Sequence, residues 1–416
     1  MTKRYHSFFL SVWNLSPYVW ALLGFLVAYF VFFIVPTFFA GHVMQFFQYL
    51  PALDPVGYDL MQALSYSRAW FIEKRSPYIG MNLYPPLVSV LFTPLLFFDF
   101  YFSYKLITVV NFLLFSVMTL LFPMIKRDAK FFPFTIFFFI TGVYSYGFQF
   151  ELERGQFNLI AMFLCLLSIL LFHNFSQSKI WRKVSYLLFT ISVQLKVYPL
   201  IFLITLVDDW KDIKSNIRRI LGLSVINFVL LFILGPKVFF DFVEAIMVQI
   251  TDFGSFWVGN HSVKSFSVFV VSKLLHQDFK YILFVQAILY TVLFLCFFLI
   301  MFRVYKRGEK GLNEYLLLGC AILALLIPPV SHDYKLSILP AFFSFLLSSN
   351  NFEKFFNKNK SNSLPLFILF FAYSSTLFSY TNKPSFLQNN LPALVVILLT
   401  VTFLYLSSTP VSDISD

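Results

Sequence analysis

Long apolar runs dominate the pattern of hydrophobic and polar positions along this chain. A membrane-spanning helix needs about 20 predominantly apolar residues. The pattern therefore predicts membrane helices at roughly 18–39, 106–125, 131–149, 157–173, 218–235, 280–302, 314–330, 336–349, 364–380 and 391–407. Three further apolar segments are short or interrupted, at 85–101, 184–207 and 264–275. Broken helices are tolerated at membrane depth only where protein buries them or a wet cavity adjoins them, so these segments indicate a site within the membrane domain.

Composition strengthens this interpretation. Of the 416 residues, 59% are hydrophobic and 12% are charged, whereas a soluble domain carries about 25% charged residues. A water-soluble fold leaves too many residues outside to hide so much apolar surface. Cys165, Cys296 and Cys320 lie in apolar runs without metal-ligand or disulfide spacing. We therefore expect one all-α domain over residues 1–416, a polytopic bundle with about 10–13 membrane helices.

The formal net charge of +11 comes from basic residues that cluster between the apolar runs. Such clusters mark cytoplasmic loops rather than a nucleic-acid surface, so no nucleic-acid partner is expected. The clusters lie at 126–130, 179–183, 211–219, 303–310 and 354–360. We place them and both termini in the cytoplasm, with the apolar stretch after Lys3 and Arg4 retained as a first helix of a plasma-membrane protein. Two long loops then lie outside, 40–84 and 236–263, the first containing helices on the membrane face.

Asp59 is the candidate general base. It lies in the first outer loop, ahead of the paired prolines Pro85 and Pro86 that force a turn at the bilayer. A carboxylate held against an apolar wall can accept a proton from a hydroxyl. Asp54 is the competing carboxylate, and a solvated loop aspartate is the alternative interpretation.

Several cations lie where polar groups are costly and therefore indicate function. Arg154 lies at the junction of two apolar helices, and Lys196 lies inside an apolar stretch. His332 and Lys335 are three residues apart, so one helical turn can direct both at one anion. Each has a structural alternative: a helix cap with an Arg–Glu pair, a lysine paired within the bundle, and a capped loop.

Five segments, in order, resemble glycosyltransferase family 87, polyprenol-dependent enzymes of the GT-C superfamily. The resemblance spans about residues 55–345 and rests on these matches: Asp59 before Pro77-Tyr78 and Tyr84-Pro85-Pro86-Leu87; Arg154-Gly155-Gln156-Phe157-Asn158-Leu159; Lys196-Val197-Tyr198-Pro199-Leu200; Asn260-His261-Ser262; and Ser331-His332-Asp333-Tyr334 before Leu339-Pro340-Ala341. The sequence departs from the family pattern at His261, where Gln is usual, and in the register of His332.

The resemblance implies an inverting transfer on the outer face. The donor would be a sugar on a polyprenyl phosphate, commonly mannose with arabinofuranose as an alternative, and the acceptor a hydroxyl of a glycan or glycolipid. Asp59 would be the base. The other roles implied are donor-phosphate binding by Arg154, Lys196, His332 and Lys335, and substrate binding by Tyr84, Gln156, Asn158, Tyr198, Asn260 and Ser262. No metal and no cofactor is expected.

Two other function classes compete with this hypothesis. Broken helices and intramembrane charge are also typical of transporters and lipid flippases, although no repeat relates two halves of this chain. A non-catalytic scaffold for envelope assembly is the third possibility.

Overall fold

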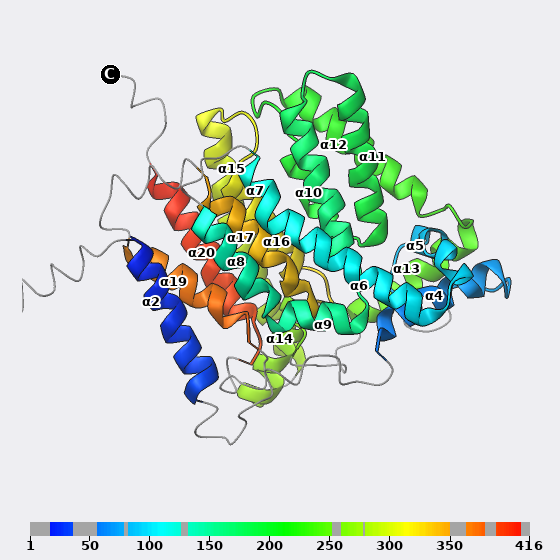
Figure 1. Cartoon of the computed structure of the whole chain (residues 1–416), viewed down its shortest axis with the longest axis horizontal. Coiled ribbons are helices and arrows are strands. Elements are labelled where there is room, and N and C mark those ends of the chain that lie inside the picture. Colours follow the sequence, from blue (N-terminus) through cyan, green and yellow to red (C-terminus); the bar gives the residue numbers. More distant parts are fainter. Residues whose placement is uncertain are drawn as a thin grey trace, which may run out of the picture.

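The computed structural model describes residues 17–35, 56–78, 82–125, 132–251, 259–277, 279–349, 363–378 and 388–408. Within these ranges the chain is helical, and its β-structure is limited to two isolated bridges, Asp209 with Lys310 and Asn260 with His332 (Figure 1). The prediction of an all-α helical membrane fold is confirmed.

The helices follow one another with short breaks. The amino-terminal half contains α2 (Pro17–Tyr29), α4 (Tyr58–Phe71), α5 (Leu87–Leu91), α6 (Phe100–Ser116), α7 (Phe122–Met124), α8 (Phe132–Val143), α9 (Tyr146–Arg154), α10 (Asn158–Asn174) and α11 (Lys179–Leu195). The carboxyl-terminal half contains α12 (Ile213–Leu230), α13 (Pro236–Thr251), α14 (Val263–Phe269), α15 (Ile282–Arg307), α16 (Glu314–Leu326), α17 (Leu339–Leu347), α19 (Ser363–Ser375) and α20 (Leu391–Ser407). Short π and 3-10 turns join them: η1 (Phe30–Ile34), η2 (Thr93–Phe97), η3 (Val117–Leu121), η5 (Tyr198–Thr205), η6 (Val270–Leu274), η7 (Phe279–Tyr281) and η8 (Asp333–Ile338).

The main hydrophobic core surrounds α16. Every residue of this helix from Tyr315 to Leu326 is buried, as expected of a helix that is apolar on all sides. In Figure 1, α16 and α17 lie in the middle of the molecule, with α8 and α20 close by. Together with α10, these helices supply most of the core.

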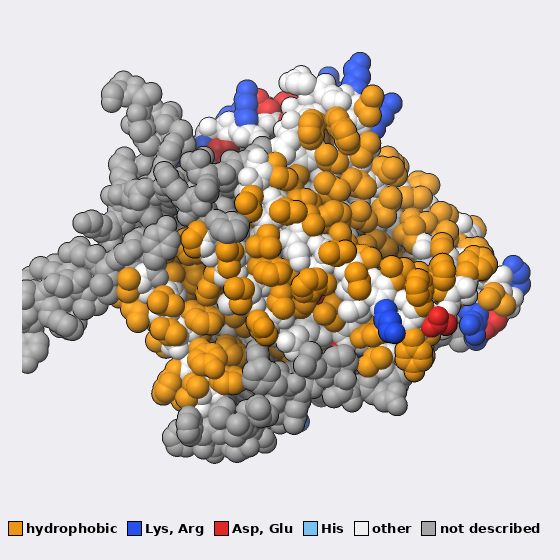
Figure 2. Space-filling view, in the orientation of Figure 1, with side chains coloured by type: hydrophobic (Ala, Val, Ile, Leu, Met, Phe, Trp, Pro, Cys, Tyr) orange, Lys and Arg blue, Asp and Glu red, His pale blue; other side chains and the backbone are white. Residues whose placement is uncertain are grey.

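The outer surface is suited to lipid. Exposed apolar side chains cover α6, α12 and α15, among them Val109, Val225 and Phe298. Figure 2 shows a broad hydrophobic face, with charged side chains gathered at its upper edge and beside α4 at the right. An apolar area of this extent is far beyond what a monomeric soluble protein exposes.

In the described part of the chain, two helical stretches are long and apolar enough to cross a bilayer, Phe100–Met124 and Ile282–Arg307. Helices α9 and α10 form a third candidate, bent by 111° at their junction. Six further apolar helices of 10–17 residues accompany them. Within the described residues, fewer helices therefore reach full length than the apolar runs predicted, and runs such as 131–149 and 184–207 are broken. The number of crossings stays a prediction.

The three irregular segments are broken, as predicted. Residues 85–101 form α5 and η2, and residues 264–275 form α14 and η6. In 184–207, α11 ends at Leu195, Lys196 is extended (φ −147°, ψ 133°), and η5 begins at Tyr198. Pro199 at the start of η5 lacks the amide that would continue α11. The predicted run 131–149 is also divided, because Ser145 caps a new helix, α9.

Helices α10 and α11 form an antiparallel pair that connects two polar ends of the molecule. The start of α10 and the end of α11 lie at one end, and the loop joining them lies at the other. Each helix has 17 residues, which corresponds to about 25 Å. Polar sites at the two ends are thus separated by most of a bilayer core.

Candidate active site

Two backbone turns at glycine residues, called glycine corners below, bring Asp59 and Arg154 together. Gly57 precedes α4 with φ +75°, and Gly155 ends α9 with φ +62°, a backbone region that suits glycine. The Gly57 amide donates to the Glu153 carbonyl at 2.7 Å. A Cβ on Gly155 would lie 3.0 Å from Cβ of Leu60. The close contact of these corners places the first turn of α4 against the end of α9.

Asp59 is buried and accepts hydrogen bonds at both carboxylate oxygens. Arg154 donates from Nη2 to Oδ1 at 2.9 Å and from Nε to Oδ2 at 3.3 Å. Gln156 donates from Nε2 to the same Oδ2. The Arg154 guanidinium also lies 4.8 Å from the centroid of the Tyr58 ring. Burial, reinforced by the Asp59 carboxylate, raises the pKa of Tyr66, also on α4, to about 12.

Gln156 joins the candidate base to a buried lysine. Its Oε1 accepts from Nζ of Lys196 at 2.8 Å, while its Nε2 donates to Asp59 and, at 3.4 Å, to the Tyr84 hydroxyl. Asn111 of α6 holds the Gln156 carbonyl at 2.6 Å. The fully buried side-chain amide of Gln156 therefore contacts Asp59, Lys196 and Tyr84, which the sequence analysis proposed separately.

The Lys196 ammonium lies between two aromatic rings. Nζ is 4.3 Å from the centroid of Tyr84 and 4.4 Å from that of Phe157. Such rings attract a cation through their quadrupoles. Among the described residues no carboxylate lies within ion-pair distance of Lys196, although the charges of Glu151 and Asp59 act on it from further away.

The sequence analysis did not identify Glu151 as a site residue. In the structure, its carboxylate holds the start of α10. Its Oε1 accepts from the backbone amides of Asn158 at 2.8 Å and Leu159 at 3.2 Å, and its Oε2 accepts from Asn158 Nδ2 at 2.8 Å. A carboxylate is favourable at a helix N-terminus. The sequence analysis considered an Arg–Glu pair here, but Arg154 pairs with Asp59. A glutamate preceding an apolar helix was the available signal.

The 331–335 segment approaches the same cluster from α16. Lys335 donates from Nζ to the Val330 carbonyl at 2.5 Å and lies 5.2 Å from the centroid of Tyr198. The Tyr198 hydroxyl in turn lies 3.5 Å from Asn158 Oδ1. His332 is the N-cap of η8, and its ring lies 5.4 Å from that of Tyr334. The predicted helical turn from His332 to Lys335 is therefore present as a 3-10 turn.

Glycine also allows close packing of this segment against α9. A Cβ on Gly147 would lie 2.8 Å from the Asp333 carbonyl oxygen. Tyr334 packs on Phe150, whose ring lies 5.8 Å from the Arg154 guanidinium. The 331–335 segment and the turn at the end of α9 that carries Arg154 therefore belong to one site.

Asn260 and Ser262 face backbone rather than open space. Asn260 accepts from the Ser331 amide at 2.8 Å, and both side chains donate to the Pro329 carbonyl at 3.0 Å. Next to them, Nε2 of His261 lies 2.9 Å from Oδ1 of Asp333, with both side chains fully buried. These residues fix the loop that carries His332 and Lys335.

The remaining expectations concern a metal and the competing carboxylate. In the described part of the chain, no group of three or more His, Cys, Asp or Glu side chains is arranged to hold a metal ion. Asp54 lies outside the described residues.

Fold and site together define the class: an all-helical membrane protein with a carboxylate, an amide and several cations buried in one cluster. The family model for glycosyltransferase family 87 matches residues 82–329, more than half of the chain. The chain therefore belongs to glycosyltransferase family 87 and is a membrane glycosyltransferase. No curated protein and no solved structure matches it. The matched range includes Arg154, Lys196 and Asn260, whereas Asp59 and His332 lie outside it.

Proposed function

We propose that this glycosyltransferase moves a sugar, with mannose expected, from a polyprenyl phosphate to a hydroxyl of a glycan or glycolipid, with inversion. The observation that carries the proposal is the shared contact at Gln156, which joins the Asp59 carboxylate to the Lys196 ammonium. A base and a phosphate-binding cation thus lie on either side of one amide. Inversion needs the base and the leaving group on opposite faces of the sugar.

In the reaction, the acceptor hydroxyl oxygen forms a bond to the anomeric carbon while the bond from that carbon to the phosphate oxygen breaks. The hydroxyl proton passes to Asp59, and the polyprenyl phosphate leaves with the electron pair. Lys196, Lys335 and His332 stabilise the developing phosphate charge through charge-assisted contacts. Arg154 holds Asp59 in the absence of substrate and turns toward the phosphate when the donor binds.

Tyr84, Gln156 and Tyr198 are proposed to line the donor headgroup, since Tyr84 and Gln156 contact the Lys196 ammonium and Tyr198 lies beside that of Lys335. Asn158 supports these side chains through its hydrogen bond to Glu151. Asn260 and Ser262 act on substrate through the loop that they hold. The break between α11 and η5 lies beside this cluster and offers the lipid tail a way in from the bilayer.

We place the site on the outer face of the plasma membrane. The basic clusters at 179–183, 211–219 and 303–310 contribute Arg182, Arg219 and Lys310 to one pocket at the far end of α10 and α11. Basic loops favour the cytoplasm, so the Asp59 end faces outward. Cytoplasmic termini and a multi-pass topology follow from the same rule.

The test is turnover of polyprenyl-phosphate mannose by purified, reconstituted protein carrying Asp59→Asn. We expect a loss of at least about 10²-fold, the usual contribution of a positioned base. Asp99→Asn is the matched control, because Asp99 caps α6 and asparagine caps equally well. Near-normal turnover by Asp59→Asn would exclude Asp59 as the base and favour Asp54.

A further inference from the structure

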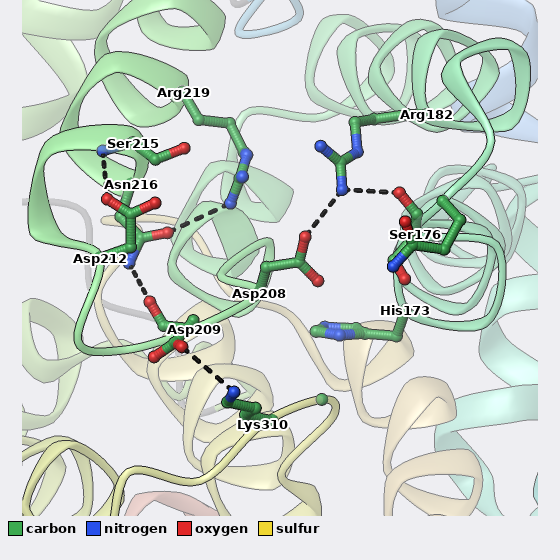
Figure 3. A pocket seen from close by; sticks show the side chains of 12 residues that line it. His173, Ser176, Arg182, Asp208, Asp209, Asp212, Ser215, Asn216, Arg219 and Lys310 are labelled. Atoms are coloured by element: carbon green, nitrogen blue, oxygen red, sulfur yellow. Dashed lines mark hydrogen bonds and ion pairs between the residues drawn. The ribbon is translucent and has the colours of Figure 1, made fainter.

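A second polar pocket lies at the opposite end of α10 and α11 from Asp59 (Figure 3). Its volume is about 590 Å³. The walls come from the α10–α11 loop, the segment 208–212, the first turns of α12 and the loop after α15. The glycosyl-transfer cluster uses none of these residues.

Two arginines of this pocket are held on one aromatic ring. The guanidinium carbons of Arg182 and Arg219 lie 5.5 Å and 4.7 Å from the centroid of Phe172. In Figure 3 both guanidiniums point into the pocket from neighbouring helices. The shared ring limits their freedom, so two phosphate-binding groups are oriented before any ligand arrives.

The charges of the lining residues leave one cation without a carboxylate. Arg182 pairs with Asp208 at 2.7 Å, and Lys310 approaches Asp209 at 3.5 Å. Arg219 donates only to neutral oxygens in the described part of the chain: the Tyr186 hydroxyl, the Leu206 carbonyl and the Asn216 side chain. The positive charge of Arg219 is thus available to an anion.

One carboxylate is likewise without a basic partner. Asp212 accepts the Ser215 amide at 3.1 Å at the start of α12, and among the described residues no Lys, Arg or His lies within ion-pair distance of it. Asp212, the N-cap of α12, and Arg219 are seven residues apart, about two turns. A ligand that complements both carries an anion and a cation within about 10 Å of each other.

The pocket lies at the depth of lipid headgroups. On α12 the apolar side chains of Ile217, Leu221 and Val225 are more than half exposed, beginning among the pocket residues and continuing beyond Arg219. Trp181, at the start of α11, is exposed beside it, in a position typical of the membrane interface. Figure 2 shows charged side chains at this upper edge, above the hydrophobic face.

We propose that this pocket binds the headgroup of an aminophospholipid from the leaflet at the basic end of the molecule. The phosphate bonds to Arg219 beside Arg182, and the primary ammonium donates to Asp212. Charge-assisted bonds at both ends would select this headgroup over one with a single charge. The inference is independent of the proposed glycosyl transfer.

The test is thermal unfolding of the full-length protein in detergent with added phosphatidylethanolamine. A lipid at about 100 times its Kd should raise the Tm of the wild type by about 3 °C. Arg219→Gln should lose the shift. Arg218→Gln, on the same helix but outside the pocket, should keep it.

Other lipids and a second variant separate the alternatives. Phosphatidylcholine, whose quaternary ammonium has no N–H, and phosphatidylglycerol should each give less than half the shift. Asp212→Asn keeps the α12 cap and should make phosphatidylethanolamine no better than phosphatidylglycerol, which tests the pocket even if Arg219→Gln fails to fold. An equal shift with phosphatidylglycerol in the wild type, or an undiminished shift in Arg219→Gln, would overturn the proposal. An equal shift from inorganic phosphate alone would overturn the assignment to a lipid.

Discussion

Arg154 holds the carboxylate of Asp59 with two bonds, 2.9 Å and 3.3 Å long, across a sequence separation of 95 residues. The pair joins the first turn of α4 to the last turn of α9, so it connects two segments that are far apart in the sequence. Both residues lie at glycine corners that contact each other. The candidate base is therefore held by the framework of the bundle.

Removing the arginine should destabilise the protein. Arg154→Gln leaves Asp59 buried without its charged partner, and we expect a loss of about 2–4 kcal/mol in unfolding free energy. Adding Asp59→Asn should restore at least half of that loss, because the unpaired charge is then gone. Thermal unfolding of the two single variants and the double variant measures the coupling. Additive effects would contradict a direct pair.

Gly155 should tolerate no side chain. Gly155→Ala combines a left-handed backbone with a Cβ 3.0 Å from that of Leu60, so the backbone is strained and Leu60 must give way by a few tenths of an ångström. We expect at least about 1–2 kcal/mol of destabilisation and a tenfold or greater loss of kcat/KM. Gly222→Ala is the matched control, since a Cβ there meets nothing within 4 Å and lies inside α12. The control should be neutral or stabilising by up to about 1 kcal/mol. Equal effects of the two variants would refute the claim that the turn at Gly155 requires glycine.

Glu151 should act by positioning Asn158 and the start of α10. Glu151→Ala leaves two backbone amides without their acceptor and removes the shorter of the two hydrogen bonds from Asn158 Nδ2, which should cost about 1–3 kcal/mol. Glu151→Gln retains one acceptor oxygen and should recover part of the stability while kcat/KM stays reduced. Glu153→Gln, on the same helix, is the control, because Oε1 of Glu153 has no hydrogen-bond partner among the described residues. Wild-type kinetics of Glu151→Gln would limit this residue to folding.

Lys196 should serve donor binding more than stability. Lys196→Met keeps the length of the stem between Tyr84 and Phe157 but removes the charge. A buried cation contributes little net stability, so the Tm should change by only a few degrees. The KM for the polyprenyl-phosphate sugar should rise at least about tenfold, as one charge-assisted phosphate contact is lost. A variant that only unfolds, with an unchanged KM in the folded fraction, would favour the structural alternative.

The apolar runs alone predicted most helices, because a bilayer requires long stretches without charge. The helices at 157–173, 280–302 and 391–407 all lie within a few residues of their observed positions. The break at Lys196-Val197-Tyr198-Pro199 was also visible, since proline cannot continue a helix. The division of 131–149 was not visible, because its signal is the capping hydroxyl of Ser145 in an otherwise apolar run.

For the site, the amino-acid sequence by itself determined which residues are costly to bury and therefore need a reason to be there: Asp59, Arg154, Lys196 and Lys335. Only the tertiary structure decided their partners. It paired Arg154 with Asp59, made Gln156 the shared contact, and turned Asn260 and Ser262 toward the backbone of 329–331. The physical reason is that burial cost belongs to a residue type and can be read locally. A hydrogen bond, by contrast, depends on where two distant segments meet.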